Sequence, residues 1–142
     1  MIDNNLIASP QNLDEQIAYQ GLMLWLDCLD LSTHAIKLAQ VLKSTQAPHA
    51  RLEYFENTVR LVPAHLVGTM RENPGQVRIA QAILADVMTE LAAICDQRAD
   101  IAANPDYLWL LNRSVDINLM MKTQVALLEK AARAMKNNNE GQ

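Results

Sequence analysis

Residues 73–95 read NPGQVRIAQAILADVMTELAAIC, and this stretch decides the fold class. Asn73 is a favourable helix cap, and proline directly after a cap is preferred at the first position of a helix. Behind this start, apolar residues recur at alternating spacings of three and four, the heptad pattern of a helix that packs against other helices. They are Val77, Ala80, Leu84, Val87, Leu91 and Ile94. We therefore expect a helix from Pro74, with a less regular continuation through Ile101.

The same start signal recurs at Asn104-Pro105-Asp106 and predicts a final helix that reaches about Lys136. One apolar stripe of this helix comprises Leu110, Ile117, Met121, Leu128, Ala132 and Met135. A second stripe beside it comprises Leu108, Leu111, Val115 and Leu119. An apolar face this wide requires contact with two neighbouring helices, as inside a bundle.

Helix boundaries are less clear in the first half of the sequence. Ser9-Pro10 predicts a helix from about Pro10 to Leu29. The side chains of Asp30-Leu-Ser-Thr33 can cap a new helix that ends near Lys43, so we expect a break or kink here, although one continuous helix is the alternative. A turn over residues 44–48 follows, and the next helical segment should kink or end where it meets Pro63.

No stretch of the chain alternates apolar and polar residues in the manner of a half-buried strand. The predicted fold class is therefore all-α: an antiparallel helical bundle of four to six helices, two of them long and C-terminal. At 142 residues the chain is the size of one domain, so we assign residues 1–142 to a single domain. Residues 1–8 and 137–142 are expected to be flexible.

Net charge and apolar content disfavour some classes of partner. A formal charge of -4 gives no general attraction for polyanions, so a nucleic-acid partner is disfavoured. The first residues lack the pattern of a secretory signal, and the longest apolar run, Leu22-Met-Leu-Trp-Leu26, is far shorter than the roughly 20 residues that a bilayer requires. We expect a cytoplasmic protein with no membrane partner. Cys28 and Cys95 are interpreted as small buried hydrophobes of a reducing compartment.

Metal and cofactor chemistry have little support. The three histidines are His34, His49 and His65, and none follows a glutamate at the Glu-x-x-His spacing of dinuclear centres in helical bundles. Glycine-rich phosphate-binding loops are also missing from a chain with only four glycines. We expect neither a metal nor a cofactor.

One motif carries plausible chemistry. The sequence Arg60-Leu-Val-Pro-Ala-His65 resembles the Arg-x4-6-His signature of the HEPN helical ribonucleases. The resemblance implies that His65 would transfer a proton during metal-independent RNA cleavage while Arg60 steadies the phosphate. It covers six residues and departs from the family pattern at Leu61, where a polar residue is usual, and at Pro63.

Because catalytic signatures are otherwise missing, we rank first a non-catalytic protein-protein interaction module of regulatory, adaptor or chaperone type. Its predicted contact residues are Trp25, Trp109, Lys130, Arg133 and Lys136. The last three, together with Lys122, make the end of the final helix basic. Apolar surface in excess of what the helices can cover also suggests a homodimer. A third hypothesis is a helical sensor of a small ligand, with Trp25, Trp109 and the polar residues 112–118 at its pocket.

Overall fold

The computed structural model describes residues 12–44, 51–96 and 98–140. Within these ranges the chain forms helices and connecting turns and has no strand, which confirms the all-α class. The elements are α2 (Leu13–Ser44), α3 (Arg51–Val59), α4 (Leu61–Ala64), the 3-10 helix η1 (Gly68–Glu72), α5 (Pro74–Cys95), α6 (Ala99–Ala102) and α7 (Pro105–Glu140). In these ranges no helix combines the length and apolar character that crossing a bilayer would demand.

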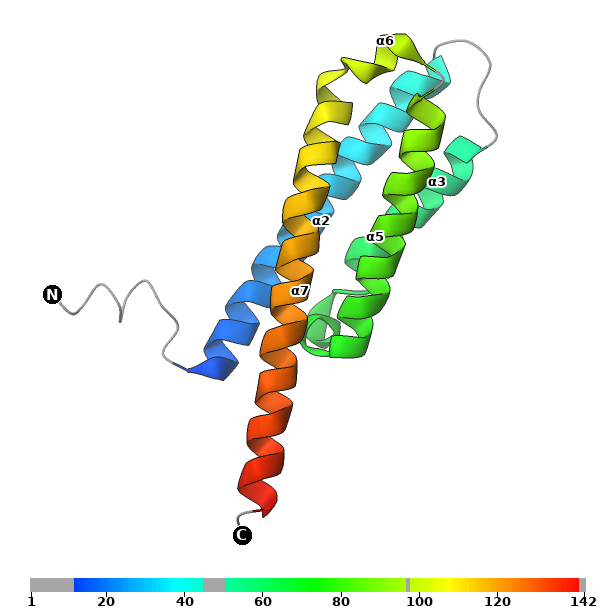
Figure 1. Cartoon of the computed structure of the whole chain (residues 1–142). Coiled ribbons are helices and arrows are strands. Elements are labelled where there is room, and N and C mark those ends of the chain that lie inside the picture. Colours follow the sequence, from blue (N-terminus) through cyan, green and yellow to red (C-terminus); the bar gives the residue numbers. More distant parts are fainter. Residues whose placement is uncertain (1–11, 45–50, 97, 141–142) are drawn as a thin grey trace, which may run out of the picture.

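Figure 1 shows α2, α3, α5 and α7 side by side, with the chain reversing direction from each of them to the next. Helix α7 packs against both α2 and α5, while α3 packs against α5 and α2. The short elements α4 and η1 lie together at one end, and α6 joins α5 to α7 at the other. The C-terminal part of α7 extends beyond the other helices (Figure 1).

Asparagine side chains start the long helices. The Asn73 Oδ1 accepts hydrogen bonds from the backbone N–H of Gly75 at 2.9 Å and of Gln76 at 3.4 Å, which confirms the predicted start of α5. Asn104 does the same for α7, accepting from the N–H of Asp106 at 2.8 Å. The start predicted at Pro10 lies outside the described residues; α2 begins at Leu13, where the Asn12 Oδ1 accepts from the N–H of Glu15 at 2.8 Å.

The break predicted at Asp30–Thr33 is wrong, because α2 is one continuous helix. The polar side chains that could have capped a new helix bond within the existing one instead. The Thr33 hydroxyl donates to the Leu29 carbonyl at 3.0 Å, and the His34 Nδ1 lies 3.0 Å from the Asp30 carbonyl oxygen. Leu31 and Ala35 continue the buried face across the same residues. Packing along this face therefore outweighs the local capping preference.

The interruption predicted at Pro63 is confirmed. Helix α3 ends at Val59, four residues before the proline, and α4 begins only at Leu61. A proline ring clashes with the carbonyl four residues earlier and offers no N–H to it, so α3 cannot continue regularly past this point. The turn predicted over residues 44–48 falls almost entirely outside the described residues.

Part of the first apolar stripe predicted for α7 is buried, whereas in the second only Leu111 packs partly against the core. Leu110, Ile117, Met121 and Leu128 belong to the core. Ala132 and Met135 are exposed where α7 extends past its neighbours, and Leu108, Val115 and Leu119 of the second stripe are exposed as well. The expected contact of α7 with two neighbouring helices is confirmed, because α7 packs against both α2 and α5, but these helices leave most of the second stripe exposed. Helix α2 flanks α7 on one side and α5 on the other, and the remaining side faces solvent.

A buried amide fixes α7 against the start of α2 and the end of η1. The Gln124 side chain is fully buried, and its Nε2 donates to the Ile17 carbonyl at 3.1 Å and to the Arg71 carbonyl at 3.0 Å. Gly21 makes room for this contact, because a Cβ at that position would lie 3.0 Å from the Gln124 Nε2 and 3.1 Å from the Arg71 Cδ. Glycine inside a helix is usually unfavourable, so the close approach is what favours it here.

We expect Gln124→Ala to lower the free energy of unfolding by about 2–4 kcal/mol, because it removes two hydrogen bonds to backbone carbonyls and leaves a cavity in place of a fully buried side chain. Urea denaturation followed by circular dichroism measures this change. Gln40→Ala, at an exposed glutamine of α2, is the matched control and should shift stability by less than about 0.5 kcal/mol. Equal stability of the two variants would contradict a structural role for the amide.

Candidate functional site

The described surface is hollowed between α5 and α7. The hollow has a volume of about 260 Å³ and is lined by Leu84, Ala85, Met88, Ser114, Val115 and Asn118. The first three residues belong to α5 and the last three to α7, so the packing of these two helices positions the hollow. Its lining is mainly apolar.

Two polar groups at the hollow have partners within the chain. The Gln81 Nε2 donates to the Asn118 Oδ1 at 2.8 Å, which links α5 to α7 beside the hollow. The Ser114 hydroxyl donates to the Leu111 carbonyl of its own helix at 2.9 Å. Because these groups are engaged, the hollow favours apolar groups over a ligand that needs many hydrogen bonds.

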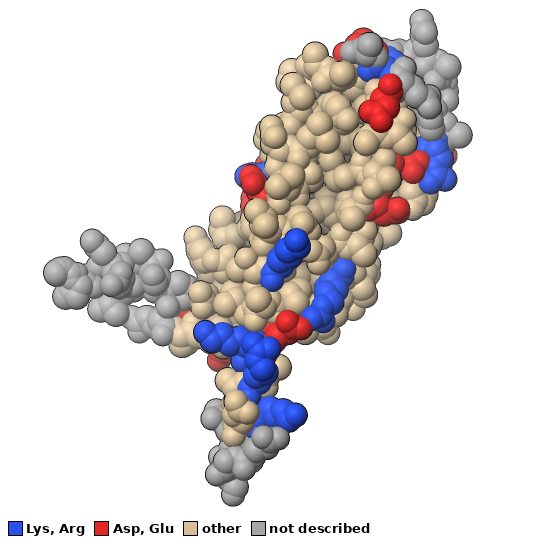
Figure 2. Space-filling view, viewed as in Figure 1, with Lys and Arg blue, Asp and Glu red and all other residues tan. Residues whose placement is uncertain are grey.

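Exposed apolar side chains of α7 extend this site along the helix. Leu108 is 46% exposed, Val115 60% and Leu119 55%, which is high for large apolar residues that recur on one side of a helix. We call the hollow, together with Leu108, Leu111 and Leu119, the α5/α7 groove. Figure 2 shows that the face formed by α5 and α7 carries few charged side chains over its upper part. Arg113, two residues before Val115 in α7, instead pairs with Asp27 of α2 at 3.5 Å.

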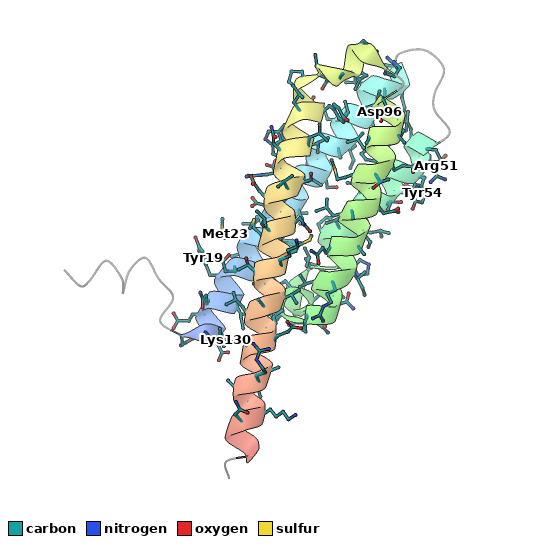
Figure 3. The ribbon with its side chains drawn as sticks, in the orientation of Figure 1. Tyr19, Met23, Arg51, Tyr54, Asp96 and Lys130 are labelled. Carbon is teal, nitrogen blue, oxygen red and sulfur yellow. The ribbon has the colours of Figure 1, made fainter. Side chains whose placement is uncertain are left out.

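The lower end of the same face is basic. Lys122, Lys130, Arg133 and Lys136 are all exposed on α7, and Figure 2 shows blue side chains gathered there. Arg78 of α5 lies beside them and pairs with Glu129. The three contact residues predicted at the end of α7 are therefore surface residues just below the groove, and Figure 3 labels Lys130 among them.

The two tryptophans lie elsewhere. Trp25 and Trp109 are half-buried and pack against the core rather than lining the groove. The Trp109 ring stacks on the His34 ring, with centroids 3.8 Å apart, and the Arg113 guanidinium lies 5.6 Å from the Trp109 ring centroid. This stack connects α7 to α2. The sensor hypothesis thus brings only Ser114, Val115 and Asn118 of its predicted residues to the hollow.

Arg60 and His65 lie on either side of α4. The Arg60 side chain is exposed, whereas His65 is half-buried and its Nδ1 lies 2.9 Å from the Gln76 Oε1 at the start of α5. This contact gives His65 a role in joining α4 to α5. Ribonuclease activity through the pair stays a prediction. His49 lies outside the described residues.

The cysteines are buried thiols, as predicted. Burial, with a smaller contribution from Asp27, raises the pKa of Cys28 from 9.0 to about 12. Burial likewise raises the pKa of Cys95 to about 11, with Asp96 adding to the effect. Because the thiolate is the reactive form, neither group is an activated nucleophile near neutral pH.

We expect iodoacetamide to modify Cys28 and Cys95 far more slowly in the folded protein than in urea at pH 8, as measured by mass spectrometry. The folded state holds both thiol protons more tightly than the unfolded state does. Their contribution to stability is therefore complete below a pH of about 9 and is lost as the pH rises towards the folded pKa values of about 11 and about 12. Rapid alkylation of both thiols at pH 7 without unfolding would contradict this assignment.

In residues 12–44, 51–96 and 98–140, no group of three or more histidine, cysteine, aspartate or glutamate side chains is arranged to hold a metal ion. A comparison of the chain with models of protein families, with curated proteins and with solved structures found no match. The α5/α7 groove is thus the candidate site on geometric grounds. Sequence reasoning identified its α7 side, the stripe from Leu108 to Leu119, but expected that stripe to face neighbouring helices.

Proposed function

We propose that this chain is a non-catalytic protein-interaction module, built on an antiparallel helical bundle, whose α5/α7 groove binds an amphipathic helix with acidic residues at one end. The observation that carries the proposal is the row of exposed apolar residues on α7 beside the hollow: Leu108, Val115 and Leu119. Apolar residues in such a row, bordered by polar surface, are typical of a contact site for another protein.

The size of the hollow supports a helix rather than a small molecule. At about 260 Å³ it is smaller than the roughly 300–1,000 Å³ of typical ligand pockets, but it can receive one or two apolar side chains. From Leu108 to Leu119 the groove is about 17 Å long at the α-helical rise, which matches a partner helix of about three turns. The small side chain of Ala85 at the hollow permits close approach of that helix.

The charged residues at the lower end of the groove indicate acidic residues on the partner helix. The upper part of the face carries few charged side chains, whereas Lys122, Arg133 and Lys136 are exposed at and below its lower end (Figure 2). A partner helix with carboxylates at the matching end would gain favourable interactions there. Because these charges are exposed, they should speed association and select the partner more than they raise affinity.

A randomised library of helical peptides, selected on the immobilised full chain, tests this proposal. We expect the selected peptides to carry apolar residues at positions i, i+3, i+4 and i+7 and acidic residues at one end. Fluorescence anisotropy of a selected peptide should show binding that weakens at least about tenfold in Val115→Glu, because the new carboxylate would lose water on binding. Lys122→Glu combined with Arg133→Glu should weaken binding several-fold and flatten its dependence on salt.

Leu26→Glu is the matched control, since it places the same carboxylate on an exposed leucine of α2, away from the groove. Binding by this variant should equal that of the unaltered chain. Peptides that bind Val115→Glu as tightly as the unaltered chain would overturn the proposal. So would a selection that returns only polar peptides.

A further inference from the structure

Helix α2 carries apolar residues on the side that faces away from the other helices. Tyr19, Leu22, Leu26 and Leu29 are 38% to 55% exposed, and Met23 beside them is 36% exposed. Figure 3 shows Tyr19 and Met23 on the outer side of α2. The opposite side of the same helix is already buried in the core through Leu24, Leu31 and their neighbours. Apolar residues that gather on one exposed side of a helix are typical of a contact site for another protein.

The outer residues form a regular seam. Steps of three, four and three separate Tyr19, Leu22, Leu26 and Leu29, which is the heptad spacing at which one helix packs against another. Polar residues limit the seam at both ends: Glu15 precedes it and Thr33 follows it at the same spacing. We call these four apolar residues the α2 seam.

We propose that the α2 seam packs against the α2 seam of a second copy of this chain, with the two helices antiparallel about a two-fold axis level with Leu24. In this arrangement Tyr19 meets Leu29 of the second copy, and Leu22 meets its Leu26. Every apolar residue of the seam then packs against an apolar residue. An interface that uses the same patch on both copies requires such self-complementarity.

Charge selects the antiparallel arrangement. In the antiparallel dimer, Lys37 of the second copy lies level with residue 11 of the first copy. It is therefore four residues from Glu15 along the helix axis, about 6 Å at the α-helical rise. The Cα–Cβ bonds of a helix tilt towards its N-terminus, so these two side chains point towards each other. The two-fold axis repeats the pair at the other end of the seam. A parallel arrangement would instead place Glu15 beside Glu15 and Lys37 beside Lys37.

The length of the seam sets the expected affinity. Standard protein interfaces bury about 800 Å² on each partner, and a seam of two heptads covers less than this. We therefore expect a reversible dimer with a dissociation constant in the micromolar range, about 1–100 µM.

Sedimentation velocity of the full chain, at concentrations from about 1 to 300 µM, tests the dimer. The unaltered chain should shift from monomer to dimer across this range, whereas Leu26→Glu should stay monomeric at unchanged helicity. Leu119→Glu, at an exposed leucine of the α5/α7 groove, is the matched control and should dimerise normally. A monomer at every concentration would refute the proposal, and so would a dissociation constant unaffected by Leu26→Glu.

Charge reversal tests the direction of packing. Glu15→Lys and Lys37→Glu should each weaken the dimer roughly tenfold at low salt, because each turns two favourable pairs into repulsive ones. The double variant should restore the dimer to within about twofold, since every pair is again of opposite sign. A double variant no tighter than the single ones would refute the antiparallel arrangement. Peptide binding in the α5/α7 groove is measured separately in Leu26→Glu, so the two proposals can fail independently.

Discussion

The buried amide of Gln124 sets the register on which the rest of the structure depends. Its two N–H groups meet two carbonyls, one near the start of α2 and one in η1. Moving α7 by one turn would leave a fully buried amide without these partners, a penalty of about 1–3 kcal/mol. The amide therefore ties three segments that are far apart in the sequence. It also determines which stripe of α7 enters the core.

The α7 side of the α5/α7 groove follows from this register. With Ile117 and Met121 turned inward between α2 and α5, Val115 and Leu119 must face outward. Arg113, on the same part of α7, points to the side that faces α2, where it pairs with Asp27 and lies over the Trp109 ring. The upper part of the face formed by α5 and α7 is thereby left with few charges (Figure 2). One packing arrangement thus gives both a buried apolar core and an apolar outer face.

The starts of α5 and α7 were predictable from local sequence. An asparagine before a proline caps a helix through hydrogen bonds to N–H groups only two or three residues later, as Asn73 and Asn104 do. The seam of α5 was also predictable, since a heptad spacing is a property of one helix. Which neighbour covers an apolar stripe is not local information. For that reason the stripe from Leu108 to Leu119 was expected to face neighbouring helices. For the same reason a break near Thr33 was favoured over a continuous α2, which depends on the packing of Leu31 and Ala35.

The α2 seam and the α5/α7 groove use different helices and share no residue. A dimer through α2 would carry two grooves, and a partner with two acidic amphipathic helices could bind both. The second binding event would then be intramolecular, and avidity could exceed the affinity of one groove by about 10²–10⁴-fold if the linker spans the distance. A weak dimer and a shallow groove, each of modest affinity alone, would together give a concentration-dependent and selective interaction. Coupling of this kind gives a physical reason for a small domain to leave apolar residues exposed on two helices.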